Sequence, residues 1–412
     1  MAEIITAAEA KEAVQARKLA REESYVAGLI DEAIDSEKYE CSLSNVSEEI
    51  IKKLEEKGYY VSKVVNAGSD YGYNVIWNFE GSPEFTPAAS IEDIANILAG
   101  DEEKVLIEVT EPISIAKGAP IAIPAGKKAT IKVDKDITVA ETGFAVADGA
   151  ELILKGEGTV KSTNKSTKGA IVEANGKNAL VTVDGVTLDC ITETGKNGNY
   201  AFAIYLLNDA SLNFKSGIVR TAYGSCISTN NTTGGNTLIN ITGGELYSDG
   251  SYAIYLAAQG VCNIKGGKVQ GVNVRMGHIN ISGTAEIIPT TITADSYDNI
   301  GVEFATSGCV WLGDSIAVMA GTYTDEAGTD CVINIKGDAT VKSDFRSAIG
   351  VYCVDLKEAQ NVKVMVANKD NVTTTDEEFE AIKVYDHAYI EAEATAHGKT
   401  YAPVAESTVI VE

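Results

Sequence analysis

A short β-strand pattern recurs along half of the chain, and this repeat limits the possible folds more than any other feature. Each copy reads apolar, any residue, apolar, one residue, a small or glycine pair, and a further apolar residue. The copies are LILKGEGTV from 152, VTVDGVTL from 181, LNFKSGIV from 212, INITGGEL from 239, CNIKGGKV from 262, INISGTAEI from 279, IAVMAGTY from 316 and INIKGDATV from 333. Their central residues recur at a mean step of about 26 residues, within the range of solenoid repeats.

A second phrase lies between these tracts, so each repeat holds at least two strands. It reads KGAIV at 168–172, FAIYL at 202–206, SCIST at 225–229, YAIYL at 252–256 and SAIGV at 347–351. Alternation at period two, bounded by Gly, Asn and Asp, indicates strands, and nothing recurs at the 3.6-residue period of a helix. Leucine-rich, ankyrin and tetratricopeptide repeats are therefore excluded. The pattern predicts a mainly β chain folded as a parallel β-helix, with one repeat in each coil.

Five of the eight tracts place Asn at the same outward-pointing position. These residues are Asn213, Asn240, Asn263, Asn280 and Asn334, whereas Ala317 is central in the tract from 316. Asn side chains on stacked coils can form a ladder of amide hydrogen bonds, or they can simply tolerate a solvated strand surface. The sequence leaves both open. Steps of 17, 23, 27, 31 and 37 residues between tracts indicate that coil length varies, so some tracts need not share one face.

Residues 1–82 differ in character from the repeats. Thr6 with Glu9 is a capping-box pattern, which predicts the start of a helix that runs to about Lys38. Ser47, followed by two glutamates, predicts a second helix that ends at Gly58.

The same module ends in a predicted β-hairpin. YYVSKVV at 59–65 and YNVIWNF at 73–79 flank the turn sequence AGSDYG. In the first helix Leu19, Val26 and Ala33 lie seven residues apart, which allows a short helical seam, but two heptads are too few to indicate a coiled coil. We expect a module of helix, helix and hairpin.

A third helix is predicted at the start of the repeats. Ser90 with Asp93 is a capping signature, and the helix should span about 90–99 with its apolar residues on one face. Such a helix would cover the first coil, where an open end exposes the aliphatic core and unpaired strand edges. We therefore predict three parts: the module at 1–82, the capped β-helix at 83–370, and residues 371–412 as a last coil or a C-terminal cap.

Charge and composition exclude several classes of function. The net charge is −25 with a pI near 4.5, which argues against nucleic acid as a direct partner because phosphate binding needs clustered Lys and Arg. No stretch approaches the ~20 apolar residues of a membrane span, and no signal peptide precedes the first helix, so a cytoplasm is the expected site of synthesis. Seven cysteines without a CxxC pair suggest free buried thiols.

The repeats resemble a known superfamily. The predicted capping helix, IPAGKKATIKV at 123–133 and degenerate coils such as GAELILKGEGTVKS are similar to the right-handed, single-stranded parallel β-helices of the pectin-lyase-like superfamily. That resemblance covers roughly residues 84–370. The first eighty residues, with KKLEEKGYYVSKVV after an Ala-rich helix, resemble a helical-plus-hairpin module of tailed-phage structural proteins.

These resemblances imply a virion protein, assembled in the host cytoplasm. The expected function is a non-enzymatic head fibre or capsid decoration protein that projects a β-helix for surface adhesion. Residues 1–82 would attach to other virion proteins of the capsid or tail, and a host-surface glycan is a further expected partner. Because phage fibres of this kind are often trimers, we expect a homo-oligomer. The alternative is a tail fibre or tailspike-type protein that binds or cleaves glycans.

Outward tyrosines are the expected binding residues. In AIYL the Ile and Leu alternate with Tyr, so Tyr205 and Tyr255 should point away from the core, with Tyr252 on the approach to its strand. Tyr297 and Trp311 lie in a longer non-repeating stretch that could carry recognition. Aromatic faces on stacked coils can contact sugar rings or pack against a partner subunit or a loop, and both readings stay open.

Catalytic and metal sites have little support in the sequence. The three histidines, His278, His387 and His397, lack metal-ligand spacing, so neither a metal nor a cofactor is expected. The best acidic candidates are three pairs that fit a solvated loop face better than an active site: Asp295 with Asp298, Asp325 with Glu326, and Asp344 with Arg346. We therefore expect no enzymatic activity.

Overall fold

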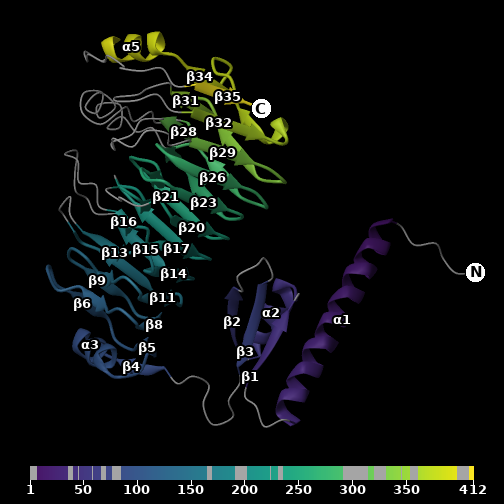
Figure 1. Ribbon diagram of the computed structural model, residues 1–412, viewed down its shortest axis with the longest axis vertical. Coiled ribbons are helices and arrows are strands. Elements are labelled where there is room, and N and C mark those ends of the chain that lie inside the picture. The colour runs from purple at the N-terminus through teal and green to yellow at the C-terminus, as the bar shows by residue number, and fades with distance from the viewer. Residues whose placement is uncertain are drawn as a thin grey trace, which may run out of the picture. The chain divides into compact units, whose positions relative to one another are not determined.

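The computed structural model describes residues 7–35, 40–44, 46–57, 59–65, 71–76, 85–164, 169–190, 202–222, 224–230, 235–290, 314–319, 331–344, 346–352, 361–396 and 408–412. The chain divides into two compact units, Met1–Glu84 and Phe85–Glu412 (Figure 1).

The first unit is a small α/β module. Its elements are α1 (Ala7–Asp35), β1 (Glu40–Ser44), α2 (Glu48–Glu56), β2 (Tyr60–Val65) and β3 (Tyr71–Ile76). The strands form one antiparallel sheet in the order β1-β3-β2. The predicted helices and hairpin are confirmed where they are described, but the prediction missed β1. Thr6, Gly58 and the hairpin turn lie outside the described residues.

The predicted helical seam lies in the core of this unit. Val26, Ile30 and Ala33 of α1 are buried together with Leu43 of β1, and Leu19 packs against the same cluster. Five further buried or packed partners come from α2 and the strands of the hairpin: Ile50, Leu54, Val61, Tyr73 and Val75. Because these contacts occupy the apolar face of α1 within one chain, the seam gives no support to a coiled coil between chains.

The second unit is a right-handed parallel β-helix with three sheets. Sheet I runs β4 (Thr86–Ala88), β5 (Lys104–Val109), β8 (Lys128–Val133), β11 (Glu151–Lys155), β14 (Leu180–Asp184), β17 (Ser211–Phe214), β20 (Thr237–Ile241), β23 (Gly260–Ile264), β26 (Gly277–Ile281), β29 (Cys331–Ile335), β32 (Asn361–Val366) and β35 (Thr408–Val411). Sheet II runs β6 (Ile113–Ile115), β9 (Ile137–Val139), β12 (Thr159–Ser162), β15 (Thr187–Cys190), β18 (Ile218–Thr221), β21 (Glu245–Ser248), β24 (Lys268–Gln270), β27 (Glu286–Ile288), β30 (Thr340–Ser343) and β33 (Val372–Thr374). Sheet III runs β7 (Ile121–Ile123), β10 (Phe144–Val146), β13 (Ala170–Asn175), β16 (Phe202–Leu207), β19 (Ile227–Ser228), β22 (Ile254–Leu256), β25 (Val272–Val274), β28 (Ile316–Met319), β31 (Ile349–Tyr352) and β34 (Ile382–Tyr385).

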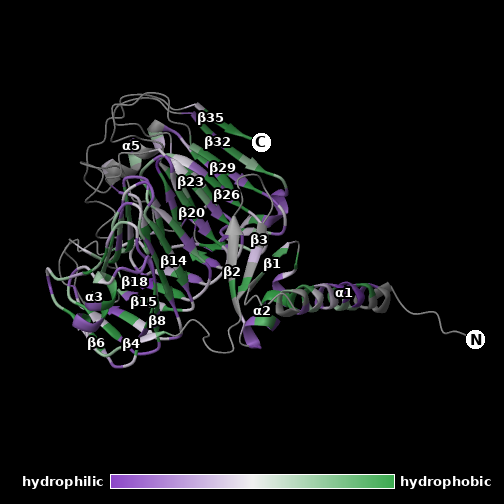
Figure 2. Cartoon of the chain, turned by 60° about the horizontal axis from the view of Figure 1, so that its bottom comes forward, coloured by the Kyte–Doolittle hydropathy of each residue, from purple (hydrophilic) through white to green (hydrophobic). Residues whose placement is uncertain are grey.

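Each coil passes through sheets I, II and III in turn, and each strand pairs in parallel with its equivalent one coil away (Figure 1). Alternate side chains point inward, as β11 illustrates, where only its second and fourth residues, Leu152 and Leu154, are buried. The inward residues are mostly Ile, Val, Leu and Ala, and they form one continuous core from Ala88 to Val372. Figure 2 shows these apolar residues following the strands.

Glycines make the corner between sheets I and II. Gly244 and Gly267 both have positive φ, 77° and 84°, and they stack in successive coils. A Cβ atom on Gly244 would lie 2.6 Å from the carbonyl oxygen of Gly217, and one on Gly267 would lie 2.5 Å from that of Gly244. The small or glycine pair of the repeated phrase is therefore the point where the chain turns, and the apolar residue after it begins sheet II.

Sheet I carries the amide ladder, one of the two possibilities that the sequence left open. The Nδ2 atoms of Asn240, Asn263 and Asn280 each donate to the Oδ1 atom of the preceding Asn at 3.0 Å, and Asn334 donates to Asn280 at 3.4 Å. The successive steps along the chain are 27, 23, 17 and 54 residues.

The placement of Ala317 in this series is wrong. Its strand β28 belongs to sheet III, where Ala317 lies opposite Asn273 and Gly350. The five tracts of the second phrase, in contrast, all fall in sheet III as one set. Strands of sheets I and III show the same alternation of buried and outward residues. The sequence pattern alone therefore cannot tell to which of the two sheets a strand belongs.

A helix covers the first coil, as predicted. In α3 (Ile91–Ala99) the Ser90 hydroxyl accepts from the Asp93 amide at 3.1 Å, and the Asp93 carboxylate accepts from the Ala89 amide at 3.0 Å. Ile94 and Leu98 are buried in the core of the β-helix. At the other end of this unit, β33, β34 and β35 extend the three sheets, and α5 (His387–Ala396) follows β34. Residues 371–412 thus contain a further coil.

Candidate functional site

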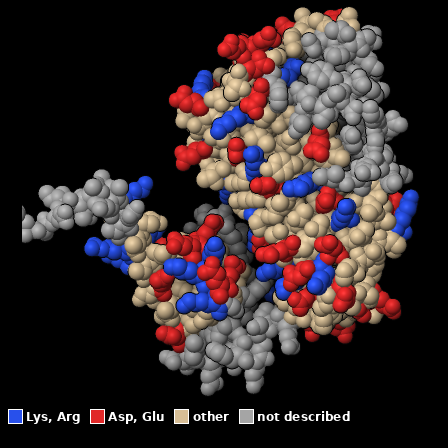
Figure 3. Space-filling view, turned by 180° about the vertical axis from the view of Figure 1, so that it is seen from behind, with Lys and Arg blue, Asp and Glu red and all other residues tan. Residues whose placement is uncertain are grey.

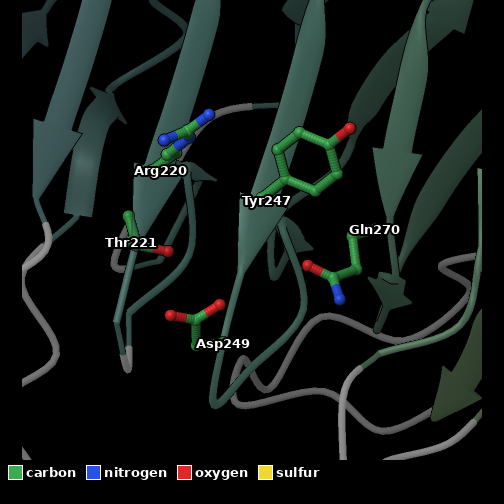
Figure 4. A pocket seen from close by; sticks show the side chains of 5 residues that line it. All are labelled: Arg220, Thr221, Tyr247, Asp249 and Gln270. Atoms are coloured by element: carbon green, nitrogen blue, oxygen red, sulfur yellow. The ribbon is translucent and has the colours of Figure 1, made fainter.

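A pocket of ≈ 330 Å³ lies on sheet II, on a face that the sequence had not marked as a site. Arg220 of β18 and Tyr247 of β21 are register partners on neighbouring coils. On the next coil, Val269 of β24 pairs with Leu246, and Gln270 is the residue after Val269. Thr221 and Asp249 complete the lining. Figure 4 shows Arg220 and Tyr247 side by side on adjacent strands, with the other three side chains below them.

The floor of this pocket is held by hydrogen bonds to the backbone. The hydroxyls of Thr221 and Ser248 both donate to the carbonyl oxygen of Gly224, the second at 2.9 Å. The Gln270 Oε1 atom accepts from the Ser248 amide at 3.2 Å. Thr221 and Gln270 line the pocket, Ser248 lies behind them, and all three are buried, so the polar groups of the floor are held in place without a ligand.

The rim combines opposite charges with an aromatic ring. Arg220 and Asp249 are exposed, and Tyr247 is half-buried. Partial burial raises the pKa of the Tyr247 hydroxyl, and a hydrogen bond with Glu245 adds to the rise, whereas the Arg220 charge opposes it. Such a pocket can hold a small polar ligand, with the ring against an apolar face and the charged groups bonding to hydroxyls. In the sequence Arg220 and Tyr247 share one signal, the outward position after the glycine corner in GIVRT and GELYS.

Two of the predicted binding tyrosines point outward on sheet III. Tyr205 and Tyr255 are half-buried and lie in one column, with Ser228 of the intervening coil between them. The Phe202 ring lies 5.0 Å from that of Tyr205, and the Arg275 guanidinium lies 5.7 Å over the ring of Tyr255. Both tyrosines therefore already have protein partners on one side.

Tyr252 does not belong to an exposed site, so this part of the prediction is wrong. Its side chain is only 1% exposed, and burial raises the pKa of its hydroxyl well above the ordinary value. Tyr252 lies at the corner before sheet III, where a Cβ atom on Gly271 would come within 2.9 Å of its ring. The alternation that places Tyr255 outward does not extend through this corner. Tyr297 and Trp311 lie outside the described residues.

A buried ion pair with stacked tyrosines lies at the entry to β28 and β31. Asp314 is fully buried, its carboxylate accepts from the Tyr352 hydroxyl, and one of its oxygens lies 3.6 Å from Nε of Arg346. Arg346 also donates to the hydroxyls of Tyr352 at 3.4 Å and Tyr389 at 3.3 Å. The rings of Tyr352 and Tyr385 stack at 4.7 Å.

This cluster corrects one of the acidic candidates. Arg346 pairs with Asp314, and Asp344 instead accepts from the Thr375 hydroxyl at 3.4 Å. Burial raises the pKa of Asp314 to about 6, although the Arg346 charge and the Tyr352 hydroxyl act in the opposite direction. Asp314 and Tyr352 are buried in this cluster, and the bond from Arg346 to Tyr389 ties α5 to the last coils. Asp295, Asp298, Asp325 and Glu326 lie outside the described residues.

The described residues show neither a metal centre nor a membrane span. Among the described residues, no group of three or more His, Cys, Asp and Glu side chains is placed to hold a metal ion. No helix in the described part of the chain is long and apolar enough to span a bilayer. No protein-family model, no curated protein and no solved structure matches this chain.

Proposed function

We propose that this chain is a non-enzymatic structural protein of a tailed-phage particle, a head fibre or capsid decoration protein that presents its β-helix for surface adhesion. It would reside in the virion after assembly in the host cytoplasm. Residues 1–82 would bind other virion proteins, and a host-surface glycan is the proposed target. The assignment to a phage particle is supported by the resemblance of the N-terminal module to phage structural proteins.

The observation that carries the proposal is the division of the chain into two units that each have their own core. One core joins α1 to a three-stranded sheet, and the other runs through the coils from Ala88 to Val372. An attachment module with its own core can bind a particle without disturbing the stacked coils. A β-helix with an in-register amide ladder suits presentation, because parallel pairing holds each coil in place.

Immunogold electron microscopy of purified particles, with antibody against residues 85–412, tests this proposal. Label on the capsid is the expected result, and label on the tail would favour the alternative. Particles without label would overturn both. A second preparation, in which residues 1–82 are deleted, should carry no label, and unchanged incorporation would refute the attachment role of the module.

The pocket on sheet II favours a second candidate, a tailspike-type protein that binds or cleaves glycans. Its aromatic ring lies beside groups of opposite charge, Arg220 and Asp249, an arrangement that can hold a sugar by its apolar face and its hydroxyls. A glycan array and an assay of reducing-end release from host capsule separate binding from cleavage. Tyr247→Ala should abolish an array signal that comes from the pocket, whereas Tyr205→Ala should abolish one that comes from sheet III.

A further inference from the structure

The outer face of sheet I is free of acidic residues over five consecutive coils. Strands β17, β20, β23, β26 and β29 read SLNF, TLINI, GVCNI, GHINI and CVINI. The chain carries 59 Asp and Glu residues and a net charge of −25. The strands of sheet III from β16 to β31 are likewise free of Asp and Glu, so what sets sheet I apart is the lysines that border it. Figure 3 shows Asp and Glu interspersed with Lys and Arg over one side of the β-helix.

A column of lysines borders this face. The residues that directly follow the five strands are Lys215, Thr242, Lys265, Ser282 and Lys336, and the backbone amides of the last four bond one coil back, to the carbonyls of Phe214, Ile241, Ile264 and Ile281. The three lysines are exposed, and within the described part of the chain none of them forms an ion pair. Because the lysines occur in every second coil, Lys215 and Lys265 lie about 10 Å apart along the stack, and so do Lys265 and Lys336.

Two further columns complete the face. The Asn ladder runs along its middle, half-buried and bonded from coil to coil. On the far side Leu238, Val261, His278 and Val332 are register neighbours, and Leu238 is 39% exposed. The five coils thus present parallel columns of cationic, amide and mainly apolar side chains on a sheet held by backbone hydrogen bonds. We call this surface the lysine face.

We propose that the lysine face binds an acidic surface of a second copy of this chain. Charge complementarity is the argument: the face carries three unpaired lysines, and all 59 acidic residues of the chain lie outside its strands. Exposed carboxylates without an ion pair among the described residues include Glu377, Glu378 and Glu380, between β33 and β34.

Two lysine faces would repel each other, so the contact joins different surfaces of the two copies. Such a heterologous contact closes into a ring when the rotation permits and otherwise extends as a filament. The Asn ladder and Leu238 would be covered in the contact, which adds apolar burial to the ion pairs. This inference rests on the homo-oligomer expected for the proposed fibre, and it names the surface that forms it.

Light scattering after size exclusion tests the proposal on the full chain at about 50 mM and about 500 mM NaCl. We expect a multiple of the 43.5 kDa protomer at low salt and a shift toward the protomer at high salt. The variant Lys215→Glu, Lys265→Glu, Lys336→Glu should raise the dissociation constant at least ~10-fold, because each reversed charge replaces an attraction with a repulsion.

A matched triple variant separates the face from net charge. Lys161→Glu, Lys342→Glu, Lys369→Glu makes the same change at exposed lysines outside the lysine face, and should leave the dissociation constant within ~3-fold of the parent. Circular dichroism and melting must show both variants folded. An oligomer that both triples leave intact, or weaken equally, overturns the assignment of the face while the homo-oligomer stands. A protomer mass at every concentration would overturn both the homo-oligomer and the assignment of the lysine face. Gold labelling of particles tests the virion role separately.

Discussion

At the scale of single residues, the hydrogen bonds of the Asn ladder stabilise the stacked coils. Asn263 is bonded on both sides, since it donates to Asn240 and accepts from Asn280, each at 3.0 Å. Asn263→Ala should therefore lower the free energy of unfolding by about 1–2 kcal/mol, because two half-buried amide groups lose their partner. Asn334→Ala is the matched control and should cost less, since its bond to Asn280 is 3.4 Å long. Denaturant midpoints measure both, and equal losses would count against the ladder.

Asp314 gives a second prediction at this scale, a dependence of stability on pH. Its pKa is about 6 in the folded protein, above the ordinary value of 3.8, because burial disfavours the charged form. The folded state thus takes up this proton more readily than the unfolded state. Stability should rise as the pH falls through 6, by about 1–2 kcal/mol between pH 8 and pH 5.

Denaturation of the parent and of Asp314→Asn at both pH values isolates this carboxyl from all other titrating groups. The amide still accepts from the Tyr352 hydroxyl but does not titrate, so the difference between parent and variant should change with pH by the predicted amount. A difference that is the same at pH 5 and pH 8 would show that Asp314 titrates normally.

At the scale of elements, the capping helix α3 protects the first coil. Ser90 and Asp93 cap this helix reciprocally, and Ile94 and Leu98 fill the end of the core. Ser90→Ala should reduce the free energy of unfolding by about 1 kcal/mol, and hydrogen exchange should rise first in β5, which α3 covers. Ser114→Ala, on an exposed position of β6, is the control and should change neither quantity. A loss spread evenly over all coils would contradict a local cap.

Elements were predictable from the sequence where alternation or capping was strong. The glycine corners and the inward Ile, Val and Leu residues located most coils, and Ser90 with Asp93 located α3. The strand β1 was missed because ECSLS holds a single strong apolar residue, Leu43. Ala317 was misplaced because sheets I and III share the same alternation.

The candidate sites were less predictable because they depend on which coils are neighbours. Arg220 and Tyr247 meet on adjacent coils, as Asp314 and Arg346 do, and variable coil length hides such pairs in the sequence. Tyr252 was misread because a strand pattern says nothing about the corner before it. The lysine face was also hidden, since Lys215, Lys265 and Lys336 become one column only after the register is known.

At the scale of the whole molecule, the two cores predict that the β-helix folds without the N-terminal module. Among the described residues, no core residue of the second unit comes from the first unit, so deletion of residues 1–84 should leave a soluble protein. Its melting temperature should fall within a few degrees of the β-helix transition in the full chain, as circular dichroism and calorimetry can measure.

A slightly longer deletion is the control for this prediction. Removal of residues 1–99 also takes away β4 and α3, and with them Ala88, Ile94 and Leu98. The edge of β5 and the apolar end of the core would then be open to solvent, and such ends pair with other chains. We expect this product to aggregate while the product of the first deletion stays soluble. Aggregation of both would mean that residues 1–84 contribute to the folding of the coils, and the attachment module could not then be regarded as a separate part.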